Sequence, residues 1–167
     1  MPSSVATGHC KLRKFTPRDS KATYKVFYKS VREGTSKYYS QAERLAWAGS
    51  QVAPADWAQR LDTQETLVAE MEGRIVGFMS LRLDGYLDMA YVLPNLMGSG
   101  IAKTLFKKLE AQAIAAGLTR LTTDASYLAR SFFLSLGWNV LSPQMVRCNG
   151  CEIQNFRMEK RISDPNS

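Results

Sequence analysis

The feature that most constrains the fold is a change of hydrophobic period in the middle of the chain. Residues 86–93 have the pattern of a strand that Pro94 stops, and a helical period begins at Gly100 and ends at Gly117. Residues 118–123 have the pattern of a strand again. A strand, a loop, a helix and a second strand form the crossover unit of a parallel sheet. The sequence therefore predicts an α/β fold with this unit at its centre.

The helical part of the chain carries start signals. Thr16 followed by Pro17 suits the beginning of a helix, and Ser40 with Glu43 three residues later matches a capping box. The residues of the crossover helix expected to face the core are Ile101, Leu105, Leu109 and Ile114. The predicted helices cover residues 16–34, 40–47, 100–116 and 128–136, and a short helical turn is expected at 54–57.

Seven segments have the composition or the alternation of strands. Two loops between them, Glu72-Gly73 and Asn149-Gly150, match two-residue hairpin turns in which glycine supplies a positive φ. We expect one domain within residues 1–167, structured over about 9–161, with a mixed sheet of about seven strands flanked by about four helices. The predicted strands are 9–15, 66–71, 75–83, 86–93, 118–123, 138–147 and 152–160.

Composition narrows the classes of protein to which the chain can belong. With 45% apolar and 22% charged residues, a chain of 167 residues suffices for one folded domain. The net charge of +7 is scattered rather than gathered in a run, which argues against a nucleic-acid-binding arm. No apolar segment is long enough to span a membrane, residues 1–15 lack the apolar core of a secretory signal, and three cysteines do not form a disulfide framework. We expect a cytoplasmic protein.

The loop between the crossover strand and its helix is the strongest candidate for a binding site. Backbone N–H groups of residues 98–100 and the positive end of the helix converge there, which suits a phosphate group. A tight turn without a ligand is the alternative. A P-loop would need glycine where Met97 and Ala102 stand, and the dinucleotide-binding fingerprint would need glycine at Lys103. These two phosphate motifs are therefore excluded.

The same loop resembles motif A of the GNAT acetyltransferases, in which Gln or Arg is followed at fixed spacing by Gly and then by Gly or Ala. Residues 97–102, Met-Gly-Ser-Gly-Ile-Ala, follow this pattern with Met97 at the position of the Gln or Arg. Residues 126–138 are similar to motif B, with Ser126 in place of an Asn and Phe133 in place of a Tyr. Further segments resemble the YafP-type branch of the superfamily, namely Tyr38-Tyr39, Ala46-Trp47-Ala48, Asp124-Ala125-Ser126, Phe132-Phe133 and Asn155-Phe156-Arg157-Met158.

The resemblance implies an acetyl-CoA-dependent N-acetyltransferase that acts on a primary amine by direct attack in a ternary complex. In such enzymes acetyl-CoA lies between two splayed central parallel strands, here those ending at Val92 and Asp124. Backbone groups of Tyr91 and Val92 are expected to pair with the pantetheine arm, and an N–H there to polarise the thioester carbonyl. The cofactor-binding residues so implied are Tyr91, Val92, Met97, Gly98, Ser99, Gly100, Ile101, Ala102, Lys103, Ser126 and Phe133. No metal ion is implied.

Asp88 is the candidate catalytic residue. It lies in an otherwise apolar strand, where an unpaired carboxylate is costly, and it matches the position of a glutamate base in several GNAT enzymes. A general base, an anchor for the acceptor and a structural salt bridge are all open for it. Phe133 cannot protonate the leaving CoA thiolate, as the motif-B tyrosine often does, so the hydroxyls of Tyr127, Ser126 and Tyr39 are the alternatives.

Several aromatic residues, two cysteines and the single histidine give weaker indications of function. Tyr39 and Trp47 are candidates for the acceptor side, although aromatic packing explains them as well. Cys148 and Cys151 have the spacing of half a metal site without two further ligands, and His9 has no nucleophile partner. The functional alternatives are a non-catalytic GNAT domain that binds CoA or a protein, and a basic protein associated with nucleic acid. The resemblance also allows a homodimer, and it leaves the acceptor amine open.

Overall fold

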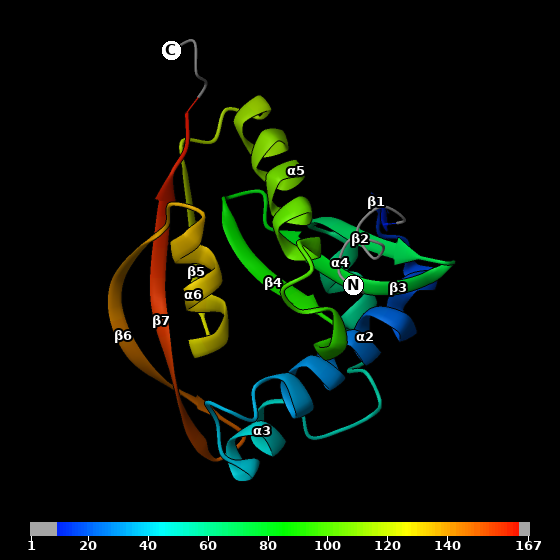
Figure 1. Ribbon diagram of the computed structural model, residues 1–167, viewed down its shortest axis with the longest axis vertical. Coiled ribbons are helices and arrows are strands. Elements are labelled where there is room, and N and C mark those ends of the chain that lie inside the picture. Colours follow the sequence, from blue (N-terminus) through cyan, green and yellow to red (C-terminus); the bar gives the residue numbers. More distant parts are fainter. Residues whose placement is uncertain (1–9, 164–167) are drawn as a thin grey trace.

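The computed structural model describes residues 10–163, in which one seven-stranded mixed sheet is flanked by α-helices (Figure 1). The strand order is β1-β2-β3-β4-β5-β7-β6, and all neighbouring strands are antiparallel except β4 and β5. This confirms the predicted α/β class and the number of strands, while His9 lies outside the described residues. The strands are β1 Cys10–Lys14, β2 Glu65–Met71, β3 Arg74–Leu81, β4 Tyr86–Val92, β5 Arg120–Ala125, β6 Asn139–Cys148 and β7 Cys151–Arg161.

The predicted helix over residues 16–34 is divided into three parts. It opens with a 3-10 turn after Thr16, continues as α2 and ends at Gly34 as a π-helical turn. The π turn was not predicted, because its wider hydrogen-bonding pattern leaves no mark in the apolar spacing. The helical segments are η1 Pro17–Asp19, α2 Ser20–Lys29, η2 Ser30–Gly34, α3 Gln41–Trp47, α4 Trp57–Asp62, η3 Pro94–Leu96, α5 Ile101–Ala115 and α6 Tyr127–Ser135.

The local turn and cap signals predicted from the sequence are present. Glu72 and Gly73 both have positive φ, 53° and 75°, and so do Asn149 and Gly150, at 46° and 84°. Such pairs join twisted antiparallel strands without splaying them. In α3 the Ser40 side chain accepts a hydrogen bond from the N3 backbone N–H, and the N3 carboxylate accepts one from the Ser40 N–H, as a capping box requires.

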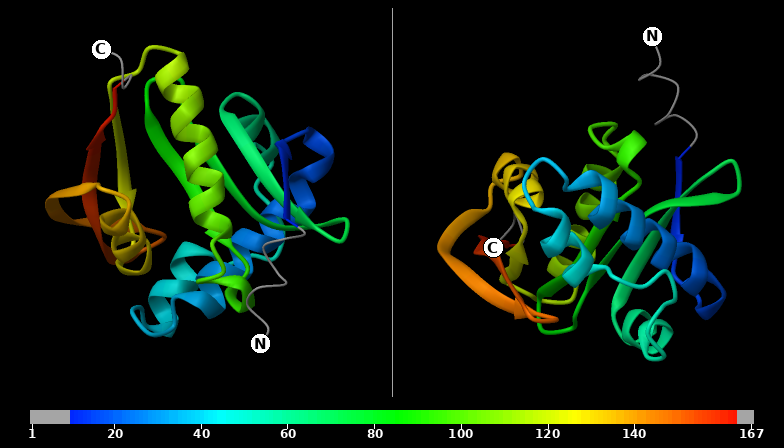
Figure 2. Two further views of the ribbon diagram at one scale, coloured as in Figure 1. Left: turned by 45° about the horizontal axis from the view of Figure 1, so that its top comes forward. Right: turned by 90° about the horizontal axis from the view of Figure 1, so that it is seen from below.

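Two apolar cores lie on opposite faces of the sheet. Neighbouring residues of β2 belong to different cores, since Leu67 packs in the core of α5 and α6 and Val68 in that of α2 and α4. Successive strand side chains point to opposite faces, so these two helix pairs cover the two faces. Figure 2 shows α5 in front of the middle of the sheet. Of the predicted inward residues of α5, Ile101, Leu105 and Leu109 are buried and Ile114 is partly buried.

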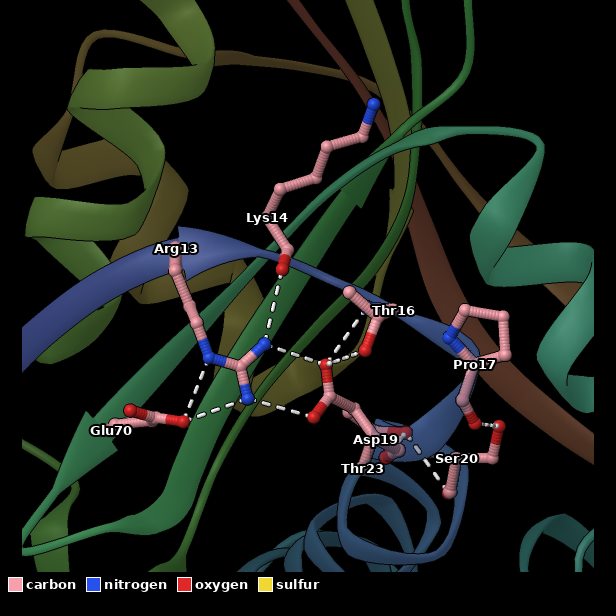
Figure 3. Close-up of polar contacts among 8 residues, drawn as sticks. All are labelled: Arg13, Lys14, Thr16, Pro17, Asp19, Ser20, Thr23 and Glu70. Atoms are coloured by element: carbon pink, nitrogen blue, oxygen red, sulfur yellow. Dashed lines mark hydrogen bonds and ion pairs between the residues drawn. The ribbon is translucent and has the colours of Figure 1, made fainter.

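A network of charges ties the first strand to the first helical turn (Figure 3). Arg13 of β1 donates to both oxygens of Asp19 at 2.7 Å and to Glu70 of β2 at 2.8 Å. Asp19 also accepts the backbone N–H of Thr16 at 2.8 Å. These contacts hold the outer edge of the sheet against α2, away from the opening described below.

Within residues 10–163, no helix is both long enough and apolar enough to cross a membrane.

Candidate functional site

The site begins where β4 separates from β5. These parallel strands pair at two positions only, and the second joins Leu87 to Thr123. Asp88 follows as an extra residue of β4, at a register shift opposite residues 80–81 of β3. A bulge of this kind bends a strand and increases its twist. β4 therefore turns away from β5, and Figure 1 shows the two strands diverging, as predicted for the central parallel pair.

Backbone groups of β4 face this opening. The Leu93 N–H donates to the Val76 carbonyl of β3 at 2.9 Å. Because hydrogen-bonding direction alternates along a strand, the backbone groups of Ala90 and Val92 point away from β3, toward the opening. The Val92 carbonyl accepts the hydroxyl of Ser30 at 2.7 Å. Among the described residues, the Val92 N–H and both backbone groups of Ala90 thus face the opening without a strand partner.

The loop after β4 presents further backbone donors. Gly98 and Gly100 have φ of 81° and 93°, which favours glycine at both positions. The first helical hydrogen bond of α5 runs from the Thr104 N–H to the Gly100 carbonyl at 3.0 Å. No backbone carbonyl of the described chain accepts the N–H groups of residues 101–103. Together with the positive end of this 15-residue helix, they suit a phosphate group.

A cavity of about 330 Å³ lies between the loop, β4 and α6. Most of its wall is apolar or made of small residues, and its size falls within the range of small-molecule sites. The lining residues are Ser30, Thr35, Trp47, Ala90, Tyr91, Val92, Leu96, Met97, Gly98, Gly100, Ile101, Ala102, Lys103, Ser126, Leu128, Ala129, Phe132, Ser135 and Leu136. We call it the loop cavity.

Two of the eleven predicted cofactor residues, Ser99 and Phe133, are not in the lining of the loop cavity, and the other nine are. The Ser99 hydroxyl is buried and has no hydrogen-bond partner within residues 10–163. Phe133 is 1% exposed and packs in the core against Trp138, with ring centroids 4.8 Å apart. Phe132 takes its place, because Ala129, Phe132 and Leu136 share the side of α6 that faces the cavity.

A second cavity of about 500 Å³ lies on the other side of β4. Trp47 and Tyr91 line both cavities, so they form the wall between them. The lining residues are Tyr24, Phe27, Trp47, Gly49, Ser50, Val52, Pro54, Asp56, Trp57, Arg60, Asp88, Met89, Tyr91 and Asn149. We call it the aromatic cavity.

Asp88 lies in the aromatic cavity and is held by two side chains. Arg60 donates to both carboxylate oxygens at 2.8 Å, and the Gln64 amide donates at 2.9 Å. Burial opposes ionisation of Asp88, but the hydrogen bonds from Arg60 and Gln64 outweigh it and lower the pKa of the carboxyl. Asp88 is therefore ionised at neutral pH and paired with a half-exposed arginine.

The two aromatic residues predicted for the acceptor side have different positions. Trp47 lines both cavities, whereas Tyr39 is 4% exposed and lines neither. The Tyr39 hydroxyl donates to the Gln154 carbonyl at 2.7 Å, and its ring packs edge-on against Trp47. Tyr39 thus packs against Trp47 without lining either cavity. Of the three residues predicted to supply a proton-donating hydroxyl, Ser126 alone lines the loop cavity, and its Oγ caps α6 by accepting the Ala129 N–H at 3.1 Å. The Tyr127 hydroxyl donates to the Gln154 side chain.

The paired cysteines lie at the tip of the β6–β7 hairpin. Cys148 and Cys151 face each other across the turn as free thiols. Their sulfur atoms contact carbonyl oxygens of α3, Ala46 at 3.3 Å and Ala42 at 3.8 Å, and Asn149 donates to the Ala46 oxygen at 2.7 Å. In the part of the chain that the structure describes, no three His, Cys, Asp or Glu residues could hold a metal ion.

Comparison with known proteins identifies the family. The model of the family described as "Acetyltransferase (GNAT) domain" matches residues 35–160. YafP of Escherichia coli (strain K12), an uncharacterized N-acetyltransferase, is 32% identical over 147 residues, which cover 88% of this chain and 93% of YafP. The chain therefore belongs to the GNAT acetyltransferase family, as the two motifs predicted.

Solved structures share the fold. A GCN5-related N-acetyltransferase from Rhodopseudomonas palustris superimposes with a TM-score of 0.87 at 36% identity, covering 91% of this chain and 95% of that chain. The PaiA N-acetyltransferase from Thermoplasma acidophilum, solved in complex with coenzyme A, has a TM-score of 0.71 at 18% identity, with coverages of 92% and 99%.

Most lining residues of the aromatic cavity were not predicted from the sequence as site residues. Arg60 was not singled out, although an aspartate in an apolar strand requires a cationic or hydrogen-bonding partner. Phe27 falls in a segment that was predicted only as a helix, and Asn149 in a predicted hairpin turn. Tyr91 was expected to act through its backbone, but the strand register turns that backbone toward β3, and its ring packs edge-on against Phe27. Since these residues come from four separate segments, no local pattern could have grouped them.

Proposed function

We propose that this protein transfers the acetyl group of acetyl-CoA to a primary amine, with both substrates bound at the same time. The observation that carries the proposal is the pair of cavities that meet at Trp47 and Tyr91. A donor in the loop cavity and an acceptor in the aromatic cavity would have their reacting groups next to each other beside Trp47 and Tyr91. Direct attack then needs no covalent acetyl-enzyme. Membership of an acetyltransferase family supports this chemistry.

The walls of the loop cavity fit the chemistry of acetyl-CoA. The N–H groups of residues 101–103 suit the pyrophosphate, and the open backbone groups of Ala90 and Val92 suit the amides of the pantetheine arm. Two neighbours of the same fold support this assignment, since PaiA was solved with coenzyme A and YncA of Salmonella typhimurium with acetyl-CoA. In the proposed complex, acetyl-CoA is the donor substrate.

The reaction requires the amine as its free base. The nitrogen lone pair attacks the thioester carbonyl carbon, the C–N bond forms, and the C–S bond breaks with its electron pair on sulfur. The amine nitrogen loses one proton and the CoA thiolate gains one, so the products are an N-acetyl amine and the CoA thiol. A backbone N–H at the opening, such as that of Val92, can stabilise the negative charge that develops on the carbonyl oxygen.

For Asp88 we propose the role of an anchor for the acceptor. A general base works best when its pKa lies near the working pH. Arg60 and Gln64 lower the pKa of Asp88, which weakens it as a base but keeps its charge at neutral pH. An ionised carboxylate on the wall of the acceptor cavity attracts an ammonium group. In this proposal, water takes the proton that the ammonium must lose.

One observation favours a second candidate function, that of a non-catalytic CoA-binding domain. Phe133 stands at the position of the motif-B tyrosine, and its ring lies in the core. A domain that had lost its proton donor would bind CoA without turnover. The aromatic cavity and the ionised Asp88 favour the enzyme, because a pure CoA binder needs neither.

Two measurements separate these functions. Acetyl-CoA at a hundredfold excess over Kd should stabilise the fold by about 2.7 kcal/mol, and CoA thiol should be released with some member of a panel of primary amines. A melting temperature unmoved by millimolar acetyl-CoA would refute both functions. A clear shift without CoA release from any amine would favour the non-catalytic domain.

A pair of glycine variants tests the position of the donor. Gly100→Val places a side chain at the proposed pyrophosphate site and should weaken acetyl-CoA binding by tenfold or more. Gly73→Val imposes similar backbone strain, since Gly73 also has positive φ, but it lies in the β2–β3 turn with nothing within 4 Å. Equal binding by the two folded variants would place the donor elsewhere.

A further inference from the structure

The aromatic cavity has a composition that points to one kind of acceptor. Five of its fourteen lining residues are aromatic: Tyr24, Phe27, Trp47, Trp57 and Tyr91. They come from α2, α3, α4 and β4. Four of them pack against one another, with edge-on pairs whose ring centroids lie 4.9 Å apart for Tyr24–Trp57 and 5.0 Å for Phe27–Tyr91, and Trp47 packs edge-on against Tyr39. Such mutual packing fixes the rings, so the cavity presents a rigid wall of flat apolar surface.

The polar ends of two of these rings are already occupied. The Tyr24 hydroxyl donates to the Ser50 carbonyl at 2.6 Å, and the Trp57 indole N–H donates to the Thr23 hydroxyl at 3.1 Å. A ligand would therefore meet the carbon surface of these side chains and not their hydrogen-bonding groups. This favours a ligand with an apolar body over a sugar or another polyhydroxyl compound.

The charged groups of the cavity favour a cation. They are the carboxylates of Asp56 and Asp88 and the guanidinium of Arg60, which give a formal charge of −1 from two negative groups and one positive group. Arg60 directs its Nε and Nη2 atoms to Asp88. These bonds engage Arg60 and Asp88 alike, so the cavity keeps its net negative charge through Asp56, and as a whole it attracts an ammonium group more than a carboxylate.

We infer that the acceptor is a primary arylalkyl amine, whose ring lies against Phe27 and its aromatic neighbours and whose amino group reaches the wall formed by Trp47 and Tyr91. The inference rests on the proposed function and specifies its acceptor. The ring excludes water from the aromatic walls on binding, and Asp88 attracts the ammonium form as it enters. The step itself remains attack of the free amine on the thioester, with CoA thiol as the second product.

Three related amines test the inference with the purified full-length protein. Phenethylamine has a ring and no carboxylate, butylamine lacks the ring, and phenylalanine adds a carboxylate. We expect kcat/KM for phenethylamine, followed by CoA thiol release, to exceed that of each of the other two by tenfold or more. A single methylene in an apolar pocket already discriminates by about 10- to 200-fold, which applies to butylamine. The carboxylate of phenylalanine is disfavoured by the net negative charge of the cavity. Equal values for phenethylamine and butylamine would overturn the role of the ring. A preference for phenylalanine would overturn the charge argument.

Two phenylalanine variants locate the effect. Phe27 is half-buried and lines the aromatic cavity, so Phe27→Leu keeps an apolar side chain of similar size while removing the ring. The ratio of kcat/KM for phenethylamine over butylamine should fall severalfold in Phe27→Leu. Phe132→Leu makes the same change in the loop cavity and should leave the ratio unchanged. An unchanged ratio in folded Phe27→Leu would refute the inference.

Failure of the inference can be told from failure of the proposed function. If phenethylamine is not acetylated but another amine of a broader panel is, the arylalkyl acceptor is wrong and acetyl transfer stands. If no amine releases CoA thiol, both fall together, and the melting temperature with acetyl-CoA then reports whether the loop cavity still binds the donor.

Discussion

Two arginine–aspartate pairs of this protein have nearly the same geometry in different surroundings. Arg13 donates to both oxygens of Asp19 at 2.7 Å, and Arg60 donates to both oxygens of Asp88 at 2.8 Å. The Asp19 carboxylate is buried and that of Asp88 is largely buried, with 8% and 11% of the side chain exposed. Asp19 lies between β1, β2 and the first helical turn, whereas Asp88 lies on the wall of the aromatic cavity.

The comparison shows that a buried ion pair does not by itself mark a functional site. In both pairs hydrogen bonds from arginine help to lower the pKa of the carboxyl. Asp19 is enclosed by its own partners, so its charge serves the fold. The Asp88 charge faces a space that a ligand can enter, and its arginine is 48% exposed where Arg13 is 34% exposed. The surroundings separate the two roles, and substitutions at each pair should separate them too.

The largest expected effect is the loss of stability in Asp19→Asn. The amide replaces one of the two acceptor oxygens by an NH2 donor and removes the charge, so the paired bonds with Arg13 are lost, and breaking a buried ion pair costs about 3–5 kcal/mol. We expect the low end of this range in the free energy of unfolding, because Arg13 keeps Glu70 as a partner. Urea unfolding measures the change, and KM for the acceptor should stay constant. Asp84→Asn is the matched control, since that arginine–aspartate pair is exposed and should contribute no measurable stability. Equal losses in the two variants would contradict the comparison.

A smaller effect is expected from pH. The hydrogen bonds from Arg13 lower the pKa of Asp19 in the folded protein, so the folded state binds this proton less readily than the unfolded state does. The stabilisation is complete above the unfolded pKa of about 3.9 and is lost as pH falls through the lower folded value. Urea unfolding at pH 7, 4 and 3 should therefore show the difference between wild type and Asp19→Asn shrinking toward acid. If the difference in the free energy of unfolding grew toward pH 3, the pKa of Asp19 would not be lowered by folding.

Asp88→Asn should affect binding more than stability. Removing the charge should raise KM for the amine by about tenfold, which corresponds to about 1.4 kcal/mol, with kcat changed less. In the proposed role of an anchor, Asp88 would not set the rising limb of rate against pH, so the limb should stay at the pKa of the amine in both proteins. If the rising limb is lost or displaced in Asp88→Asn and kcat falls a hundredfold, Asp88 is instead the general base.

The smallest effect is expected from Arg60→Lys. Lysine keeps the charge but cannot bind both oxygens of Asp88 in the planar fork of a guanidinium. Because Arg60 is half-exposed, water can replace the lost hydrogen bond, and KM for the amine should change only a few-fold. Arg13→Lys makes the same replacement in the enclosed pair and should lower the free energy of unfolding more than Arg60→Lys does. A larger loss of unfolding free energy in Arg60→Lys than in Arg13→Lys would contradict the structural role given to the Arg13–Asp19 pair.

The loop cavity, which is the proposed donor site, was predictable because its signals are local. The positive φ at Gly98 and Gly100, the stop at Pro94 and the helical period after the loop all depend on residues close in sequence. The same holds for both hairpin turns and for the capping box at Ser40. Backbone geometry of this kind is dictated within a few residues, so the sequence by itself determined the crossover, the glycine loop and the order of the elements.

The aromatic cavity, which is the proposed acceptor site, was decided by the tertiary structure. Asp88 could be recognised in the sequence as an isolated carboxylate. Its environment, on which its role as a base, an anchor or a salt bridge depends, is set by Arg60 and Gln64, which lie more than twenty residues away. The exchange of Phe133 for Phe132 in the cavity wall depended on the rotation of α6 against the sheet. Contacts of this kind join segments whose only relation is their place in the packed fold. The sequence determined where the backbone could bind a donor, and packing alone decided which side chains would face it.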